Sequence, residues 1–149
     1  MAQIPGRGPP LVAGVFLDSS VTLAWFLPDE HSATTDALLD RVVFEGALVS
    51  GLWPIEVGNA FLVAQRHRRV SQAERTRALQ QLASLPIDID SATSSRAWEA
   101  SLGLADQYRL TLYDAVYLEL AIREHLPLAT LDQRLRRAAA AAGVNLLGN

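Results

Sequence analysis

The feature that most constrains the fold of this chain is a regular alternation between short apolar runs and longer stretches of helical periodicity. Five runs are typical of buried strands: 14–18 (GVFLD), 47–50 (ALVS), 86–90 (PIDID), 126–130 (LPLAT) and 144–147 (VNLL). Continuously apolar strands separated by helices favour a parallel sheet that is covered on both faces. The sequence therefore predicts an α/β fold, a three-layer α/β/α sandwich around a mainly parallel sheet of about five strands.

Local signals place the helices between these strands. Pro54 suits the first residue of a helix, and Ser71 with Glu74 forms a capping box. Gly143 stops the last helix, because glycine readily ends helices. The predicted helices are 19–27, 32–45, 54–69, one that begins at Ser71, 92–108, one that contains Asp114, and 132–142.

Length and composition predict one soluble domain. The chain has 149 residues, half of them apolar, which is enough for a single well-packed core. The opening MAQIPGRGPP is rich in Gly and Pro, so we expect a flexible tail over 1–13 and a single domain over 14–149. The run LVAGVFL is too short to span a membrane, and no signal peptide is recognisable. The protein is therefore expected to be cytoplasmic, and the absence of cysteine fits a reducing compartment.

The basic and histidine residues exclude several kinds of site. The formal net charge is −3, and all 13 basic residues are arginine. A phosphorelay receiver and a haloacid-dehalogenase-type phosphatase both need a lysine, so neither class fits. The phosphatase would also want a second aspartate where this chain has Ser20, two residues after Asp18. The three histidines show no spacing typical of zinc ligands.

Four carboxylates occupy equivalent places in the predicted fold. Asp18 closes the first strand, and Asp132 follows the fourth. Glu56 and Asp114 lie in the first turns of their helices, and all four are embedded in apolar sequence. Because parallel strands end at the same edge of a sheet, these side chains are expected to share one rim, where ligands of such folds gather.

Each carboxylate taken alone has a simpler explanation. Asp18, Asp114 and Asp132 suit helix N-caps, and Glu56 suits the positive end of a helix dipole. Together, however, carboxylates about 4 Å apart repel one another by a few kcal/mol. A rim of them without lysine needs a cation, and oxygen ligands select Mg²⁺ or Mn²⁺. Water on such an ion can attack a phosphodiester, which predicts a metal-dependent phosphodiesterase.

Four segments then resemble a known family. In order along the chain they are VFLDSSVTLAWFLPDE (15–30), PIEVGNAF (54–61), LYDAVYLELA (112–121) and LATLDQRL (128–135). They are similar to the signature segments of PIN-domain ribonucleases, specifically the VapC-type toxins of type II toxin–antitoxin systems. The resemblance covers the chain from about Val15 to Leu147. It implies the PIN-like form of the α/β/α sandwich.

The resemblance also implies roles for individual residues. The family's acidic tetrad falls on Asp18, Glu56, Asp114 and Asp132, which would hold one or two Mg²⁺ or Mn²⁺ ions. It implies endonucleolytic cleavage of RNA by metal-activated water, leaving a 3′-hydroxyl. A cognate antitoxin protein and a homodimer are the expected partners. Thr130 and Asn59 are expected to lie next to the acids and to orient them without binding the ion directly.

Contacts with RNA are expected from arginines near the fourth acid. Arg134, Arg136 and Arg137 follow Asp132 within about two turns of helix. The run RHRR at 66–69 fits an RNA contact and a solvated helix end equally well. The aromatic residues that flank three of the acids, Trp25, Trp53 and Tyr113, are expected in the core. Two alternatives stay open: a PIN module without catalysis that serves as a protein or RNA-binding scaffold, and a DNA or structured RNA substrate.

Overall fold

A parallel five-stranded sheet forms the centre of the protein. The computed structural model describes residues 13–148, so most of the expected tail, 1–13, lies outside the described residues. The strands are β1 (Val15–Leu17), β2 (Ala47–Val49), β3 (Ile87–Ile89), β4 (Leu128–Ala129) and β5 (Leu146–Leu147). Their order is β3-β2-β1-β4-β5, and every neighbouring pair is parallel. This confirms the predicted α/β class and strand number.

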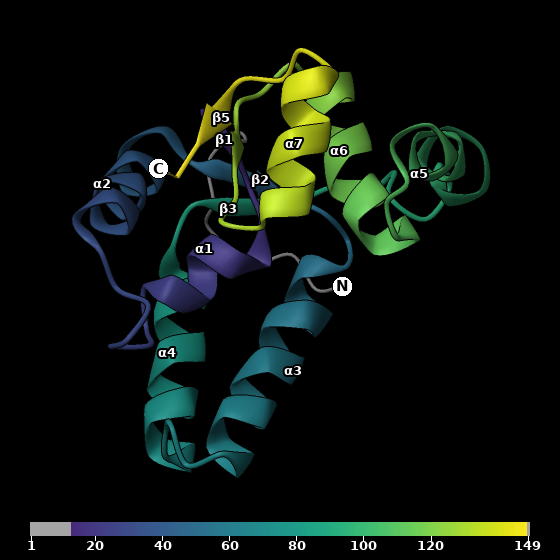
Figure 1. Cartoon of the computed structure of the whole chain (residues 1–149). Helices are drawn as coiled ribbons and strands as arrows, with labels where there is room; N and C mark the ends of the chain where they lie inside the picture. Colours follow the sequence, from purple (N-terminus) through teal and green to yellow (C-terminus); the bar gives the residue numbers. More distant parts are fainter. Residues whose placement is uncertain (1–12, 149) are drawn as a thin grey trace.

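Helices fill every connection between the strands in the described part of the chain. They are α1 (Ser19–Ala24), α2 (Ala33–Glu45), α3 (Trp53–Arg66), α4 (Gln72–Ser84), the π-helix η1 (Ala97–Ser101), α5 (Leu102–Tyr108), α6 (Leu112–Glu124) and α7 (Gln133–Ala141). Figure 1 shows α3 and α4 as a helical hairpin that extends away from the sheet. No helix among the described residues has the length and apolar character needed to cross a membrane.

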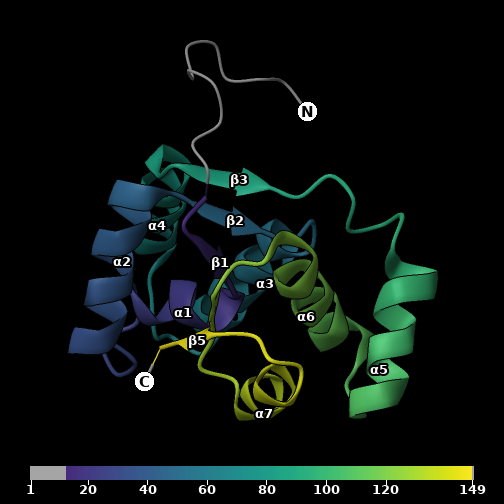
Figure 2. The ribbon, with the colours of Figure 1, turned by 90° about the horizontal axis from the view of Figure 1, so that it is seen from above.

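Two apolar clusters, one on each face of the sheet, make the three layers. Val15 and Leu17 of β1 pack with apolar residues of α1, α2, α3 and α4. Phe16 points to the opposite face and packs with α6 and α7. This alternation follows from the two-residue period of a strand. Figure 2 shows α2 and α6 on opposite sides of the strands, so the sheet is buried between helices.

Three helices differ from the prediction in where they begin or end. The helix expected over 92–108 begins only at Ala97, because Thr93 holds the preceding segment in a turn: its hydroxyl donates to Asp90 and accepts from the backbone N–H of Gly51. The first helix ends at Ala24 rather than at 27. The third begins at Trp53, one residue before the expected proline, and ends at Arg66. The predicted capping box at Ser71 is present.

A cluster of buried charges joins α6 to the end of β3. Arg123 bridges Asp90 at 2.9 Å and Glu119 at 2.9 Å, and Arg96 also donates to Glu119. The side chains of Asp90 and Glu119 are only 8% and 5% exposed. These contacts fix the height of α6 against the sheet, and so fix the position of its first turn.

Loss of the bridging arginine should therefore destabilise the fold. We expect Arg123→Met to lower the free energy of unfolding by about 3 kcal/mol or more, because it leaves the Asp90 carboxylate without its cation and Glu119 with Arg96 alone. Urea denaturation measures the loss. The control is Arg41→Met, which breaks the exposed Arg41–Glu45 pair and should cost less than about 1 kcal/mol. Equal losses in the two variants would show that the buried cluster contributes no more to stability than an exposed ion pair does.

Candidate active site

The four acids predicted from the sequence meet at the carboxyl edge of the sheet. Asp18 follows β1 and Asp132 follows β4, while Glu56 and Asp114 lie in the first turns of α3 and α6. Figure 1 shows the starts of α1, α3, α6 and α7 close together beside this edge. Their charges interact: Asp18 and Asp132 both act on Asp114, and Asp18 also acts on Glu56. We call these four residues the acidic rim.

Asp18 is the most enclosed member of the rim. It is 6% exposed, and its Oδ2 accepts from the hydroxyls of Thr130 at 2.7 Å and Ser20 at 2.8 Å. Its Oδ1 accepts from the backbone N–H of Ser19 at 2.7 Å, which makes Asp18 the N-cap of α1. Both oxygens are thus fixed by donors from three directions, and the carboxylate has one orientation.

Thr130 and Ser20 connect Asp18 to the segment that carries the fourth acid. The backbone N–H of Asp132 donates to the Thr130 hydroxyl at 3.1 Å, and the N–H of Leu131 donates to Ser20 at 3.0 Å. Thr130 is fully buried. The two hydroxyls therefore set the distance between the first and fourth acids, which is the kind of supporting position expected for Thr130.

Glu56 is held by a tyrosine from the opposite face of the sheet. The Tyr117 hydroxyl donates to Oε1 of Glu56 at 3.0 Å, and the Ser19 hydroxyl donates to Oε2 at 3.4 Å. The Tyr117 ring is 1% exposed and stacks on Phe16 with centroids 5.6 Å apart. Burial, together with the charges of Asp18 and Glu56, raises the pKa of Tyr117 far above its usual range, so the phenol stays a donor at all ordinary pH values.

Asp114 is not the cap of its helix. The N-cap of α6 is Thr111, whose hydroxyl accepts from the backbone N–H of Asp114 at 3.1 Å. The capping explanation is therefore wrong for Asp114. It holds for Asp18 and for Asp132, whose Oδ1 accepts from the N–H of Leu135 at 3.1 Å. A half-buried carboxylate without a capping duty needs another reason for its place.

Electrostatics make the ionised rim unfavourable in the absence of a cation. Burial raises the pKa of Asp18, and the charge of Asp132 adds to this. Burial and the nearby acids likewise raise the pKa of Glu56 and of Asp114. Hydrogen bonds from Thr130, Ser20 and Tyr117 oppose the shifts only in part. Three carboxylates with raised pKa values in one place form a site that favours bound positive charge.

The donor set of the rim fits a hard divalent cation. The side-chain atoms that could bind a metal ion here are carboxylate and hydroxyl oxygens, and oxygen atoms are the preferred ligands of Mg²⁺ and Mn²⁺. Among residues 13–148 no three carboxylate or imidazole groups already stand at the spacing of ligands to one ion. The side chains that could approach an ion at the rim are Asp18, Glu56, Asp114 and Asp132.

The three arginines predicted to contact RNA differ in their exposure and in their partners. Arg134 is exposed in the first turn of α7, and its charge acts on Asp114. Arg137 is also exposed. Arg136 is turned elsewhere, because its guanidinium donates to the carbonyls of Thr130 at 2.8 Å and Leu147 at 2.9 Å, which ties α7 to β5.

Asn59 lies exposed on α3, one turn after Glu56, and no hydrogen bond joins it to the acids within the described residues. Of the flanking aromatics, Trp53 is buried and Trp25 is half-buried, with its indole N–H bonded to the carbonyl of Thr35. The expected burial of Tyr113 is wrong: it is 66% exposed beside Asp114, because it points away from the buried face of α6.

Sequence reasoning missed three residues that shape the rim. Ser19 and Ser20 follow Asp18 directly, and the start of a helix gives their hydroxyls access to the preceding carboxylate. Tyr117 lies three residues after Asp114 and so shares its face of the helix. That spacing was visible, but its partner Glu56 is 61 positions away in the chain. No local pattern could reveal this pair.

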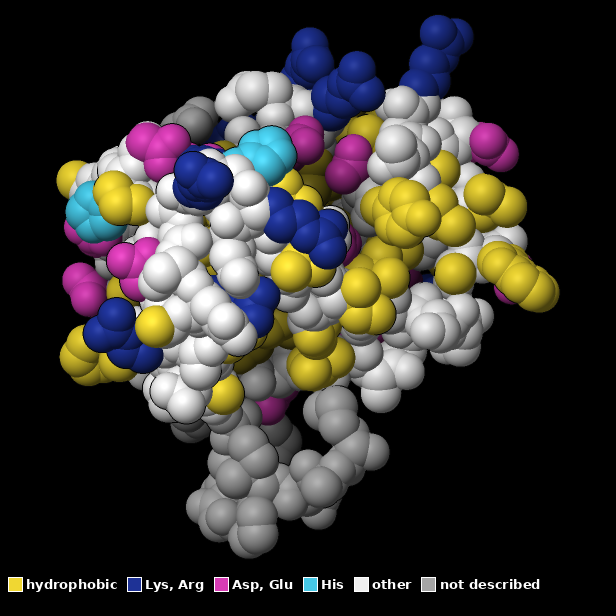
Figure 3. All heavy atoms as spheres, turned by 90° about the horizontal axis from the view of Figure 1, so that it is seen from below, with side chains coloured by type: hydrophobic (Ala, Val, Ile, Leu, Met, Phe, Trp, Pro, Cys, Tyr) yellow, Lys and Arg dark blue, Asp and Glu magenta, His cyan; other side chains and the backbone are white. Residues whose placement is uncertain are grey.

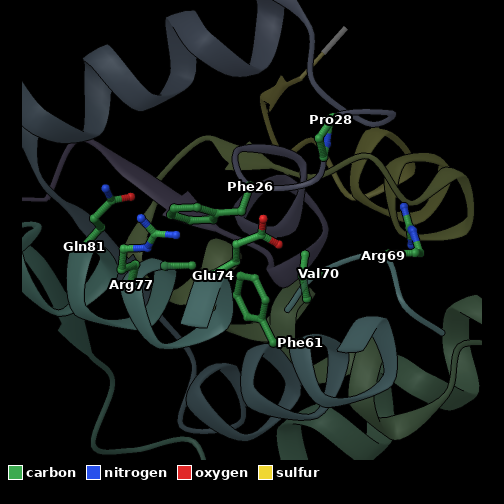
Figure 4. A pocket seen from close by; sticks show the side chains of 9 residues that line it. Phe26, Pro28, Phe61, Arg69, Val70, Glu74, Arg77 and Gln81 are labelled. Atoms are coloured by element: carbon green, nitrogen blue, oxygen red, sulfur yellow. The ribbon is translucent and has the colours of Figure 1, made fainter. Parts of the chain in front are cut away.

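The surface around the rim is mixed in character. Figure 3 shows the face that looks down in Figure 1, with carboxylates and arginines close together and hydrophobic side chains gathered on the side where α5 and α6 lie. The exposed apolar residues on those and the adjoining elements include Ile55, Trp98 and Tyr113. A separate hollow of about 370 Å³ lies against the α3–α4 hairpin, with Phe26 and Phe61 at its floor (Figure 4). None of the four acids lines it.

Comparison with known proteins supports the fold and its family. The sequence matches the family model described as PIN domain over residues 15–141. No protein with a curated description matches.

Solved structures with a similar fold come from several organisms. PAE2754 from Pyrobaculum aerophilum is 24% identical, with a TM-score of 0.65 and 87% of each chain covered. A toxin–antitoxin complex from Klebsiella pneumoniae is 20% identical, with a TM-score of 0.58 and coverage of 79% of this chain and 86% of that one. FitAcB from Neisseria gonorrhoeae is 16% identical, with a TM-score of 0.63 and coverage of 90% and 96%. At these identities the likeness concerns the fold.

The raised carboxylate pKa values predict how stability depends on pH. Between their ordinary and raised pKa values, Asp18, Glu56 and Asp114 bind more protons in the folded than in the unfolded state. Stability of the protein in EDTA should therefore rise as the pH falls from 7 toward the ordinary carboxylate range. Urea denaturation across this pH range measures the effect. A flat profile, or one that Asp114→Asn leaves unchanged in slope, would contradict it.

The opposite trend belongs to a lower pH range. Burial alone would raise the pKa of Asp90, but hydrogen bonds from Arg123 and Thr93 outweigh it and lower the pKa. The stability that this carboxylate contributes is present above its ordinary pKa of 3.8 and is lost as the pH falls below it. The two trends together give a maximum of stability on the acidic side of neutrality.

Proposed function

Because the chain belongs to the PIN domain family, we propose that it is a metal-dependent endoribonuclease and the toxin of a toxin–antitoxin pair. The observation that carries the proposal is the acidic rim. Four carboxylates from four separate elements meet at one edge of the sheet, and three of them have pKa values raised by burial and by one another. An arrangement that disfavours its own charges is expected where a cation is bound during function.

Each residue of the rim would have its own role in binding the ion and in cleavage. Asp18, fixed by three donors, and Asp114, free of capping, are the best placed to hold Mg²⁺ or Mn²⁺. A bound ion of this kind supplies a Lewis acid and a water of lowered pKa for attack on the RNA phosphodiester. Glu56, oriented by Tyr117, would accept a proton or contact the ion, and Asp132 would do so from the start of α7.

Partners follow from the same proposal. One similar structure is a toxin–antitoxin complex, which supports a protein antitoxin as partner for this chain. Such a partner would block the acidic rim by placing a basic side chain there, since the rim attracts cations. A homodimer, an RNA substrate and action in the cytoplasm complete the proposal.

The first test replaces the acid that has no capping duty. Asp114→Asn keeps the size of the side chain but provides a poor ligand for Mg²⁺, and Thr111 still caps the helix. We expect metal-dependent cleavage of RNA by the purified protein, and a loss of more than about 100-fold in the variant, since even supporting residues of metal sites contribute 10–100-fold. Cleavage of labelled total RNA with Mn²⁺ and with EDTA is the measurement.

The matched control for this test is Asp40→Asn, which removes one exposed carboxylate from α2, away from the rim. It should cleave like the wild type. If the wild type neither cleaves RNA nor binds Mn²⁺ in calorimetry, the catalytic proposal fails. The protein would then be a PIN module that serves as a binding scaffold.

A second test concerns the orientation of Glu56. Tyr117→Phe removes only the hydroxyl that donates to Glu56 and keeps the ring on Phe16. We expect activity and Mn²⁺ affinity to fall about 10- to 100-fold, with little change in melting temperature. The control Tyr113→Phe alters an exposed ring and should change neither metal affinity nor stability. Unchanged metal affinity in Tyr117→Phe would leave its hydroxyl with a purely structural role.

A further inference from the structure

A cleft lined by three arginines lies beside the acidic rim. It has a volume of about 360 Å³ and is formed by the link between α5 and α6 on one side and by α7 on the other. Its lining residues are Tyr108, Arg109, Leu110, Arg134, Arg137, Ala138 and Ala141. We call it the arginine cleft. None of its lining residues is acidic.

The arginines of this cleft lack the partners that most other arginines have. Six arginines elsewhere are held by carboxylate, amide or carbonyl oxygens: Arg41, Arg69, Arg75, Arg96, Arg123 and Arg136. Within the described part of the chain, the guanidinium groups of Arg109, Arg134 and Arg137 make no hydrogen bond or ion pair. Three cations that share one cleft repel one another, so an anion bound between them would relieve this repulsion.

The position of the cleft links it to the rim. Arg134 is two residues after Asp132, and its charge acts on Asp114. Arg137 lies three residues further along α7 and so on the same face of the helix. Arg109 approaches from the other side, directly after α5. The cleft therefore begins at the acids and leads away from them along α7.

Arg109 takes a backbone conformation that few residues with a side chain adopt. Its φ is 52° and its ψ is 47°, in the left-handed region that favours glycine. The N–H groups of Arg109 and Leu110 both donate to the carbonyl of Ala105, which closes the end of α5. The chain thus carries an arginine where glycine fits best, and this residue faces the cleft.

The remaining lining suits a base or sugar rather than a second charge. Tyr108, Leu110, Ala138 and Ala141 give apolar surface between the guanidinium groups. Aromatic and apolar surfaces bind unstacked bases, while arginine binds phosphate through paired N–H groups. A nucleotide combines these two chemistries, whereas an acidic peptide offers carboxylates without a flat ring.

We propose that the arginine cleft binds one nucleotide of a single-stranded RNA next to the bond that is cleaved, and that Arg109, Arg134 and Arg137 hold its phosphate. The inference rests on the proposed function for its RNA substrate, and it adds a subsite beyond the acids. It assigns a role to Arg109. It also makes cleavage dependent on the length of the RNA, because a dinucleotide cannot fill the rim and the cleft together.

The test separates binding from cleavage. The full-length protein in EDTA is titrated into a fluorescent single-stranded RNA oligonucleotide at several salt concentrations, and anisotropy gives the affinity. The test variant is Arg109→Gln/Arg134→Gln/Arg137→Gln. The matched control is Arg66→Gln/Arg68→Gln/Arg77→Gln, which removes the same charge at and near the tip of the α3–α4 hairpin, where these arginines likewise have no partner among the described residues.

The cleft variant should bind RNA at least 10-fold more weakly at moderate salt, and the magnitude of the slope of log K against log salt should fall by about 0.7, since the cleft holds one phosphate and each single-strand phosphate contact contributes about 0.7. The control variant should lose less of its RNA affinity and less of its salt dependence than the cleft variant does. With Mn²⁺ present, KM for a long RNA should rise in the cleft variant, while a dinucleotide should be cleaved equally by it and by the wild type.

Two results would overturn the subsite. One is equal binding, salt slope and KM in the cleft and control variants while the wild type cleaves RNA. The other is binding of a polyglutamate peptide as tight as that of RNA and lost in the same cleft variant, which would assign the cleft to an acidic protein. Absence of cleavage by the wild type would count against the proposed function instead, because binding is measured without metal.

Discussion

The burial of several carboxylates together at the carboxyl edge of the sheet is the constraint around which the site is built. Parallel strands bring Asp18 and Asp132 to one edge, and the following helices bring Glu56 and Asp114 to the same place. Burial raises the pKa values of Asp18, Glu56 and Asp114, and the charges of neighbouring acids add to this. Hydroxyl donors from Ser20 and Thr130 hold the geometry without neutralising the charge. The fold thus tolerates a destabilising feature, which the cation of the proposed function would relieve.

In a second cluster of acids, arginine side chains pair with the buried carboxylates. The side chains of Asp90 and Glu119 are 8% and 5% exposed, yet Arg123 pairs with both and Arg96 pairs with Glu119, and the pKa of Asp90 is lowered rather than raised. Both clusters include residues of α6, within two turns of each other. Paired charge fixes the helix, and the unpaired carboxylate at its start is the one to which the proposed function assigns a ligand. Hydrogen-bonded guanidinium groups therefore distinguish this cluster from the acidic rim, where the exposed Arg134 acts on Asp114 only through its charge.

The sequence predicted the sheet, its parallel strands and the meeting of the four acids, because strand ends and helix starts obey local rules. It failed where contacts are long-range. The turn around Thr93 depends on Asp90 and Gly51, and the Tyr117–Glu56 contact joins two faces of the sheet. Arg134, Arg136 and Arg137 look alike in sequence, yet Arg136 alone bonds to carbonyls of neighbouring segments. Burial of Tyr113 was expected from its apolar neighbours, but its position on the helix turns it outward.

The stacking of Tyr117 on Phe16 has a consequence for genetics. Phe16 lies in the middle of the central strand, fully buried and with no polar atom of its own in the side chain. It nevertheless sets the position of the hydroxyl that orients Glu56. Under the proposed toxin function, a selection for mutants that have lost toxicity would therefore yield substitutions at Phe16 among those at the acids. Some of the folded but inactive mutants would carry their change inside the hydrophobic core, at a position that never meets the substrate.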